Sequence, residues 1–181
     1  MNQERSIKIS KKLSRILRHH PDMIGLKLDE NGWADVHELI QKFGMPPLSL
    51  LTLKTVVAEN DKKRFSFNDD FSKIRANQGH SIDIDLALSE TEPPDILFHG
   101  TATKSLQSIK GQGLIKGSRQ HVHLSKDEQT AVRVGGRHGV AAVLKVKAKE
   151  MFEAKNYPFY ISDNGVWLTD HVPVRFLIFP S

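Results

Sequence analysis

Arginine and histidine side chains recur at separate places along this chain of 181 residues, and together they suit phosphate chemistry. Arg18 and His19 end the stretch LSRILRHHP, Arg64 ends NDKKR, and Arg137 lies within GGRHG. A guanidinium stays charged at physiological pH and presents a planar fork that matches phosphate oxygens. Imidazole titrates near neutrality and can donate or accept a proton. Such a set can bind a dianionic phosphate and stabilise charge during its transfer.

Each of these clusters also has an ordinary structural explanation. Cations at the end of a helix gain roughly 0.3–1 kcal/mol from its dipole, which is the better explanation of Arg18 and His19 taken alone. The charges around Arg64 suit a solvated turn, and the glycines beside Arg137 suit a helix-to-strand turn. A site is favoured because arginines from three distant parts of the chain can converge in a cleft between domains.

The stretch LFHGT, with HVHLS downstream, is a candidate nucleotide site. A strand that ends at His99, Gly100 and Thr101 leaves backbone N–H groups beside a small residue, where a ribose or phosphate can approach. A buried histidine bonded to nearby backbone explains His99 equally well. His121 and His123 share one face of a strand, but no nearby Asp, Glu or Cys completes a metal site around them. We therefore expect no metal.

Composition narrows the class of protein. A net charge of +5 and a pI of about 9.4 are compatible with a polyanionic partner without requiring one. The absence of cysteine excludes disulfides and thiolate zinc sites. The polar N-terminus resembles no secretory signal, and no apolar run is long enough to span a membrane. We expect a cytoplasmic protein.

The first half of the chain predicts three helices and a hairpin. Apolar spacing predicts a helix over residues 4–20 that ends before Pro21. Asp35 is the expected N-cap of a second helix, which Gly44 closes, and a third follows Pro46-Pro47. RFSFNDDFSKIRAN predicts a β-hairpin. This order of elements is that of a winged-helix module, and the analogy extends to fold rather than to function.

The second half follows an acidic, proline-containing linker at 82–94 and is rich in strands. A helix is expected to end near Gly111, and a capping box predicts that Ser125 caps a helix over about 126–135. No parallel βαβ rhythm occurs, so we expect an α+β domain with a split, mostly antiparallel sheet. The predicted strands are ILFHG, HVHLS, AAVLKVKA, PFYIS, VWLTD and RFLIF.

These stretches together resemble the NAD-dependent RNA 2′-phosphotransferases, the tRNA-splicing 2′-phosphotransferase family. The resemblance spans nearly the whole chain, in the family's order. It implies a winged-helix-like RNA- and phosphate-binding lobe (1–81), a linker (82–94) and an ADP-ribosyltransferase-like NAD-binding lobe (95–181). The stretches that carry it are LSRILRHHP, GWADVHELI, NDKKRFSF, IRANQGHS, LFHGT, HVHLS, VGGRHG and YISDNGVWL.

The resemblance also implies a reaction and its partners. An internal RNA 2′-phosphate attacks NAD, nicotinamide leaves, and a 2′-phospho-ADP-ribosylated RNA forms. Transesterification then releases RNA with a free 2′-hydroxyl and ADP-ribose 1″,2″-cyclic phosphate. NAD is consumed as co-substrate, RNA is the other partner, and neither a metal nor a protein partner is implied. Two alternatives remain open: NAD-dependent ADP-ribosylation of terminal phosphates or other acceptors, and a nucleic-acid-binding module without turnover.

Carried over residue by residue, the resemblance assigns two groups of site residues. Many ADP-ribosyltransferases carry a glutamate where this chain has Val166, and an anionic phosphate acceptor needs no such base. His20 stands at a position that the family pattern leaves variable. The implied catalytic residues are Arg18, His19, Arg64 and Arg137; the implied NAD-side residues are His99, His123 and Val166, with Gly100, Thr101, Ser125 and Asn164 as their neighbours.

Overall fold

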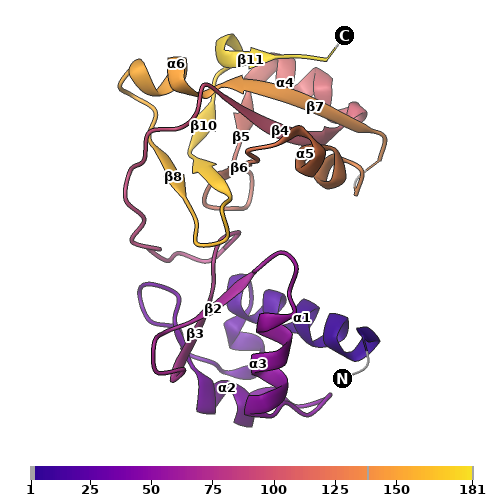
Figure 1. The fold of residues 1–181 in the computed structure, drawn as a ribbon, viewed down its shortest axis with the longest axis vertical. Helices are drawn as coiled ribbons and strands as arrows, with labels where there is room; N and C mark the ends of the chain where they lie inside the picture. Colours follow the sequence, from indigo (N-terminus) through magenta and orange to yellow (C-terminus); the bar gives the residue numbers. More distant parts are fainter. Residues whose placement is uncertain (1–2, 138, 181) are drawn as a thin grey trace. The chain divides into compact units, whose positions relative to one another are not determined.

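The computed structural model describes residues 3–137 and 139–180, which form two compact units, residues 1–87 (unit 1) and 88–181 (unit 2). His138, within the GGRHG stretch, lies outside the described residues. The residues predicted as a linker are held by both units. The N–H of Asp85 donates to the carbonyl of Glu30 in unit 1, and the N–H of Thr91 donates to that of Phe159 in unit 2. Figure 1 shows the elements of each unit.

Unit 1 contains the predicted helices and hairpin. Strands β2 and β3 form the hairpin, and β1 extends it into an antiparallel sheet of order β1-β3-β2. The three helix predictions and the hairpin prediction are therefore confirmed. The elements are α1 (Gln3–Arg18), η1 (Pro21–Ile24), β1 (Ala34–Asp35), α2 (Val36–Lys42), α3 (Leu50–Ala58), β2 (Phe65–Phe67) and β3 (Lys73–Ala76).

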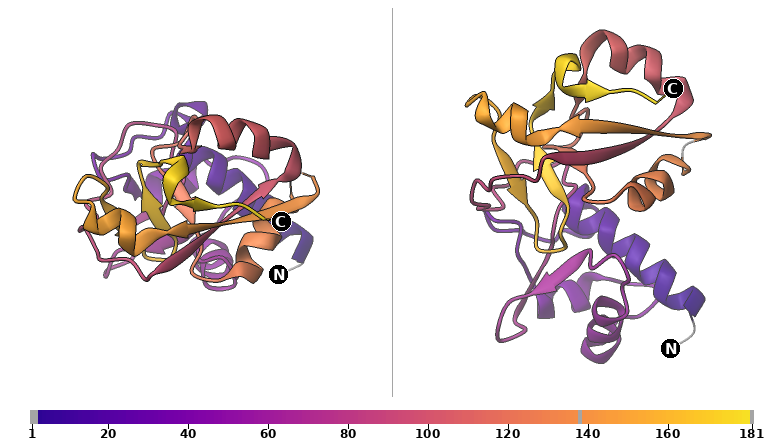
Figure 2. Two further views of the ribbon diagram at one scale, coloured as in Figure 1. Left: turned by 90° about the horizontal axis from the view of Figure 1, so that it is seen from above. Right: turned by 45° about the horizontal axis from the view of Figure 1, so that its top comes forward.

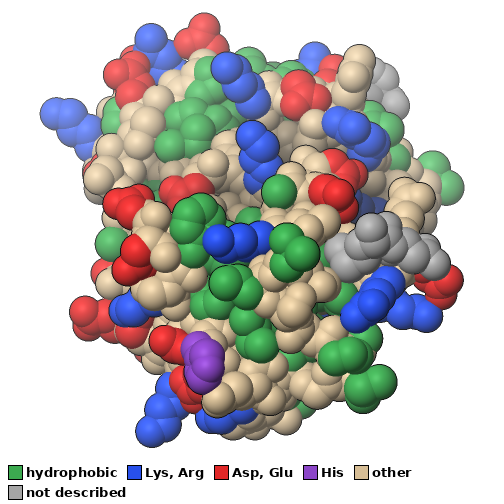
Figure 3. Space-filling model, turned by 60° about the horizontal axis from the view of Figure 1, so that its bottom comes forward, with side chains coloured by type: hydrophobic (Ala, Val, Ile, Leu, Met, Phe, Trp, Pro, Cys, Tyr) green, Lys and Arg blue, Asp and Glu red, His purple; other side chains and the backbone are tan. Residues whose placement is uncertain are grey.

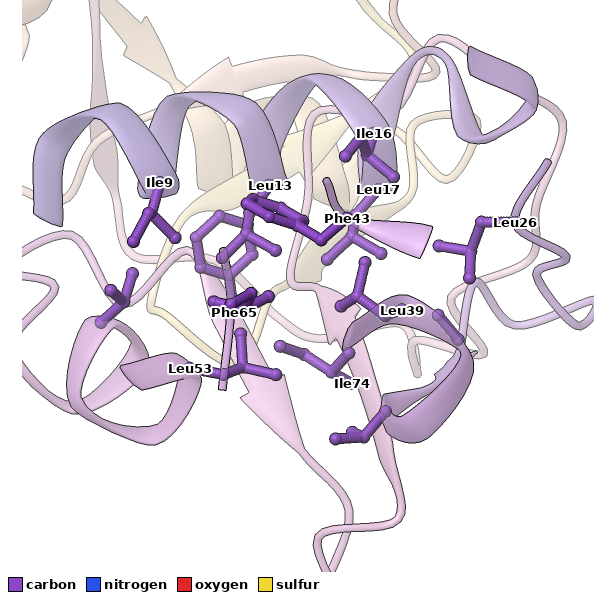
Figure 4. Packing of buried hydrophobic residues seen from close by; sticks show 14 of the residues in the cluster. Ile9, Leu13, Ile16, Leu17, Leu26, Leu39, Phe43, Leu53, Phe65 and Ile74 are labelled. Atoms are coloured by element: carbon purple, nitrogen blue, oxygen red, sulfur yellow. The ribbon is translucent and has the colours of Figure 1, made fainter. Parts of the chain in front are cut away.

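The core of unit 1 is built on the apolar face of α1. Ile9, Leu13, Ile16 and Leu17 are fully buried and point toward α2, α3 and the hairpin (Figure 4). Burying a side chain of this size stabilises a fold by roughly 1.5–3 kcal/mol. This packing holds the helix and so determines where its C-terminal residue, Arg18, lies.

Local signals decide where the helices of unit 1 begin and end. Asp35 caps α2 by accepting from the N–H of Glu38 at 2.8 Å, as predicted. Gly44 follows that helix with a φ of +70°, which suits glycine. Helix α1 ends at Arg18, two residues before the predicted end at 20. The N–H groups of His19 and His20 both donate to the carbonyl of Arg15, which closes the last turn.

Unit 2 is an antiparallel β-structure with short helices. One sheet has the order β11-β7-β4, a second has the order β6-β9-β8, and β10 pairs with β5. The pairings found among the described strands are antiparallel, which confirms the α+β class. Helix α5 packs on β4 and β7 (Figure 2). The strands are β4 (Ile96–Ala102), β5 (Leu114–Ile115), β6 (Val122–Leu124), β7 (Ala141–Lys147), β8 (Phe159–Ile161), β9 (Trp167–Thr169), β10 (His171–Val172) and β11 (Leu177–Ile178); the helices are η2 (Thr103–Ser105), α4 (Leu106–Gln112), α5 (Glu128–Gly135), α6 (Ala148–Glu153) and η3 (Val174–Phe176).

Three local predictions in unit 2 were wrong. The strand predicted to end at His99, Gly100 and Thr101 continues to Ala102 and pairs with β7 along its length. Asp127, rather than Ser125, caps α5: its carboxylate accepts from the N–H of Thr130 at 2.8 Å. The backbone of Ser125 is instead engaged in a bridge to Phe98. Only the end of RFLIF is a strand, because Val174–Phe176 form a 3-10 turn. In the described part of the chain, no helix combines the length and the apolar character needed to cross a membrane.

Candidate functional site

A five-residue segment after β3, residues 77–81, connects the candidate residues of unit 1. The N–H of Asn77 donates to the carbonyl of Arg64 at 2.9 Å, and its side-chain amide donates to the carbonyl of Lys63 at 2.7 Å. At the other end, the N–H of Ser81 donates to the carbonyl of Arg18 at 3.0 Å. The 77–81 segment thus ties the end of α1 to the start of β2.

The same segment contacts the side chains of Arg18 and His19. The hydroxyl of Ser81 lies 2.8 Å from Nδ1 of His19. Gly79 has a φ of +87°, and a Cβ there would lie 3.6 Å from Nη1 of Arg18. Nε and Nη2 of Arg18 are shielded from solvent, where a fixed charge acts more strongly than in water. Three of the four predicted catalytic residues therefore adjoin one short segment.

In unit 2, His99 and His123 are joined across two strands. Nδ1 of His99 lies 3.0 Å from the carbonyl oxygen of His123 and must donate to it, since a carbonyl only accepts. Burial lowers the pKa of His99 below its ordinary value of 6.5, and the bond to the carbonyl only partly opposes this. His99 is therefore neutral near pH 7, and its Nε2 is an acceptor suited to a hydroxyl group.

The ring of His123 has the opposite tautomer. Nη1 of Arg119 lies 3.3 Å from Nδ1 of His123, and a guanidinium can only donate. The hydrogen of a neutral His123 ring is thus on Nε2. Arg119 was not predicted, because it lies in the bend before β6, where a spacing of four residues predicts no contact as it would on a helix. The histidines consequently differ in which nitrogen can accept a hydrogen bond.

Ser125 lies where the two larger sheets of unit 2 meet. It exchanges backbone hydrogen bonds of 2.8 and 2.9 Å with Phe98, the residue before His99. In the ladder between β6 and β9, Leu124 pairs with Trp167. The next step of this antiparallel register carries the chain from Ser125 toward Val166. His99 of β4 and His123 of β6 therefore lie on neighbouring strands, with Ser125 directly after β6 and Val166 directly before β9.

The loop that carries Asn164 and Val166 is organised by Ser162. This serine is 3% exposed, and its Oγ accepts from the N–H of Val166 at 3.2 Å. The same hydroxyl lies 2.7 Å from Oδ1 of Asn164 and 3.1 Å from the carbonyl of Val166, and can donate to either. Gly165 completes the turn with a φ of +76°. Ser162 was missed because a serine in YISDNG looks like an ordinary turn residue.

Gly100 and Thr101 lie against α5. A Cβ on Gly100 would be 1.8 Å from the carbonyl oxygen of Ala131, and one on Gly135 would be 2.5 Å from that of Thr101. Real Cβ atoms essentially never come this close, so both glycines are required for the helix to pack on β4. This packing is a sufficient reason for Gly100; its contact with a nucleotide stays a prediction.

Arg137 is exposed and lies just beyond α5 in unit 2. Its N–H donates to the carbonyl of Val134 at 3.3 Å, which continues the last turn of the helix. The structure therefore brings Arg18, His19 and Arg64 to one segment of unit 1. The convergence of Arg137 with them stays a prediction.

Charge is dispersed on the face of the molecule that Figure 3 draws. Lys and Arg side chains are interspersed there with Asp, Glu and hydrophobic side chains. Recognition of a phosphate would accordingly depend on individual arginines rather than on a broad basic patch on this face. Within residues 3–137 and 139–180, no group of three His, Cys, Asp or Glu side chains could hold a metal ion. The expected absence of a metal stays a prediction.

Comparison with known proteins decides the family. Residues 4–171 match the family model described as RNA 2′-phosphotransferase, Tpt1 / KptA family. The chain belongs to this family. A probable RNA 2′-phosphotransferase of Flavobacterium johnsoniae is 54% identical over the full length of both chains. Those of Fusobacterium nucleatum (50% identical, over 97% of this chain and 99% of the relative) and Acaryochloris marina (52%, over 94% of each) are also similar.

The match to the RNA 2′-phosphotransferase family includes both groups of candidate residues. Its range begins before Arg18 and ends after Val166, so it covers unit 1 and most of unit 2. The resemblance inferred from the sequence is thus confirmed for the family as a whole. Sequence reasoning within the family pattern missed Asn60, Asn77, Ser81, Arg119 and Ser162, which contact the candidate residues or their backbone.

Proposed function

We propose that this protein is an enzyme that removes an internal 2′-phosphate from RNA and transfers it to NAD. The observation that carries the proposal is the 77–81 segment, which adjoins Arg18, His19 and Arg64 in a chain of this family. Two guanidinium groups and an imidazole are suited to bind a dianionic phosphate. The alternative, a binding module without turnover, explains the arginines but not the histidine pair of unit 2.

The proposed reaction has two steps. In the first, an oxygen of the RNA 2′-phosphate attacks the ribose carbon that bears nicotinamide, and the carbon–nitrogen bond breaks as nicotinamide leaves. In the second, the adjacent 2″-hydroxyl attacks phosphorus, and the RNA 2′-oxygen leaves with a proton. The products are RNA with a free 2′-hydroxyl and ADP-ribose 1″,2″-cyclic phosphate.

Unit 1 would supply charge and a proton to this reaction. Arg18 and Arg64 of unit 1, with Arg137 of unit 2, would bind the phosphate oxygens and stabilise negative charge during the attack on phosphorus. His19, whose Nδ1 adjoins the Ser81 hydroxyl, would bond the phosphate or move a proton at Nε2. Together with the order of α1, α2, α3, β2 and β3, this supports a winged-helix-like, RNA-binding role for unit 1.

Unit 2 would bind NAD through neutral groups. The buried, neutral ring of His99 fits a ribose hydroxyl, because its Nε2 can accept a hydrogen bond from that hydroxyl. His123 and Val166 would border the nicotinamide, with Gly100, Thr101, Ser125 and Asn164 around them. Val166 supplies no base, which suits an acceptor that is already anionic. This donor set fits an ADP-ribosyltransferase-like role for unit 2.

The direct test uses an oligonucleotide with one internal 2′-phosphate, incubated with NAD and the protein. We expect nicotinamide release and dephosphorylated RNA in equal amounts, together with the cyclic phosphate. A parallel reaction with terminal 5′- or 3′-phosphates tests the alternative acceptors. Accumulation of ADP-ribosylated ends without cyclic phosphate would favour that alternative. An intact 2′-phosphate would refute the proposal, and no nicotinamide release with either kind of substrate would refute both.

A further inference from the structure

Asn60 is a buried polar residue in the turn that leads from α3 to Arg64. Its side chain is enclosed, with 8% of the residue exposed. Its Oδ1 accepts from the N–H of Lys62 at 3.2 Å and from that of Arg64 at 3.4 Å. The same oxygen lies 3.4 Å from Nη1 of the Arg64 guanidinium. One amide oxygen therefore contacts both the backbone and the charged end of Arg64.

The other end of the Asn60 amide reaches α1. Its Nδ2 donates to the hydroxyl of Ser10 at 2.9 Å, and this contact is buried. Ser10 is on the helix that ends at Arg18, about two turns before that residue. The Asn60 amide therefore connects the helix that carries Arg18 and His19 with the turn that carries Arg64. A buried hydrogen-bonded amide is costly to leave without its partners, so the connection resists rearrangement.

The backbone of the turn depends on the same residue. The N–H of Lys63 donates to the carbonyl of Asn60 at 2.8 Å, and Lys63 has a φ of +41°. Such a φ is unusual for a residue other than glycine. The Asn60 side chain accepts from N–H groups of this turn, while the buried Asn77 donates to the carbonyls of Lys63 and Arg64. The direction in which Arg64 leaves the backbone is thus set by two asparagines.

We propose that Asn60 is a positioning residue that aims the Arg64 guanidinium for 2′-phosphate transfer, an inference that rests on the proposed function. The neutral amide is essential to this role. An amide oxygen orients a guanidinium without placing a negative charge beside it. A carboxylate at this position would form an ion pair with Arg64 and compete with the substrate.

The test is a double-mutant cycle between Asn60→Ala and Arg64→Ala, with kcat and KM measured on the 2′-phosphorylated oligonucleotide. In the otherwise wild-type protein we expect Asn60→Ala to lower kcat about tenfold, with a smaller change in KM. In the Arg64→Ala background the same substitution should have almost no further effect, because no guanidinium remains to be aimed. A purely structural role would give the same fold-loss in both backgrounds and would overturn the proposal.

Asn60→Asp provides the second variant, and it carries the test if Asn60→Ala does not fold. The carboxylate can accept from Arg64, and the Ser10 hydroxyl can turn to donate to it, so the fold is retained. We expect a melting temperature near that of the wild type but a loss of kcat at least as large as that of Asn60→Ala. Wild-type kcat in Asn60→Asp would refute the proposal.

Asn68→Ala is the matched control in the same unit. Asn68 also closes a turn through its amide, which accepts from the N–H of Lys73 at 2.7 Å and donates to the hydroxyl of Ser72 at 3.1 Å. We expect a lower melting temperature but unchanged kcat, and a kcat loss equal to that of Asn60→Ala would contradict the inference. A wild-type protein without activity on the oligonucleotide would refute the proposed function itself, which is a distinct result.

Discussion

The catalytic candidates of unit 1 and the NAD-side candidates of unit 2 lie in opposite electrostatic settings. In unit 1, Arg18 and Arg64 are permanent cations, and short polar residues around them bond mainly to their backbone. In unit 2, burial makes His99 neutral, and a backbone carbonyl determines which of its nitrogens can accept. The first setting suits an anionic phosphate, and the second suits uncharged hydroxyl groups of a nucleotide.

This difference between fixed charges and neutral hydrogen-bonding groups predicts which substitutions each group of residues tolerates. A fixed charge acts over several ångströms, and its loss cannot be compensated by a neighbouring neutral group. A neutral histidine acts only through one hydrogen bond, which contributes about 1 kcal/mol and depends on geometry. Substitutions at the arginines and His19 should therefore affect the chemical step most, and those at the NAD-side residues of unit 2 should affect NAD binding and the packing around it.

The largest expected effect is that of Arg64→Ala. Removing one positioned charge donor should lower kcat by roughly 10²–10³-fold, with less change in the KM for NAD. Product analysis should show accumulation of ADP-ribosylated RNA, because the attack on phosphorus loses its charge stabilisation. Arg64→Lys, which retains the charge without the planar fork, serves as the control and should recover only part of the rate. Unchanged kcat in Arg64→Ala would contradict the view that fixed charges govern the chemical step.

Gly100→Ala tests whether packing constrains unit 2. The new Cβ would lie 1.8 Å from the carbonyl oxygen of Ala131, so α5 must move away from β4. We expect a loss of about 3 kcal/mol in the free energy of unfolding, measured by denaturant titration. Gly111→Ala is the control, because a Cβ there meets nothing within 4 Å. Equal stability of the two variants would show that α5 does not restrict this strand.

The two adjacent histidines that follow α1, His19 and His20, should differ in their contribution to kcat. His19 contacts Ser81, whereas His20 is exposed. We expect His19→Ala to lower kcat about 10²-fold and His20→Ala to leave it within a factor of two, since general acid–base groups contribute in that range. Rates of phosphate transfer measured on both variants decide the matter. Similar losses of kcat in the two variants would mean that both histidines act only through positive charge at the end of the helix.

The smallest expected effect is a pH dependence of stability from His99. Its pKa is below 6.5 in the fold, so the unfolded chain binds more protons between the two pKa values. Stability should therefore fall as the pH drops below about 6.5, by at most about 1.4 kcal/mol per pH unit from this one group. Burial also lowers the pKa of His121, which adds a contribution of the same sign.

The measurement for this prediction compares unfolding free energies of the wild type and His99→Asn at pH 7.5 and 5.5. Carboxylates contribute equally to both proteins, so the difference isolates His99. We expect the variant to lose less stability on acidification. The same pH dependence in both would show that His99 is not kept neutral by the fold.

Local patterns predicted the elements because their causes are local. The apolar spacing of α1, the Asp35 cap and the hairpin after Arg64 each depend on neighbours a few residues away. The failure at Ser125 is instructive, because the capping-box spacing was present. The strand bridge to Phe98 occupied the backbone of Ser125, and Asp127 then supplied the cap. A tertiary contact thus overrode a local signal.

By itself, the sequence determined the α+β class, the family and the residue types available for phosphate and nucleotide chemistry. Only the tertiary structure decided which other residues contact and orient these candidate side chains. Ser81 meets His19 across 62 positions of sequence, and Asn60 meets Ser10 across 50. The neutrality of His99 likewise depends on burial by the folded chain. Such contacts have no period or spacing in the sequence, because they form only when distant elements pack together.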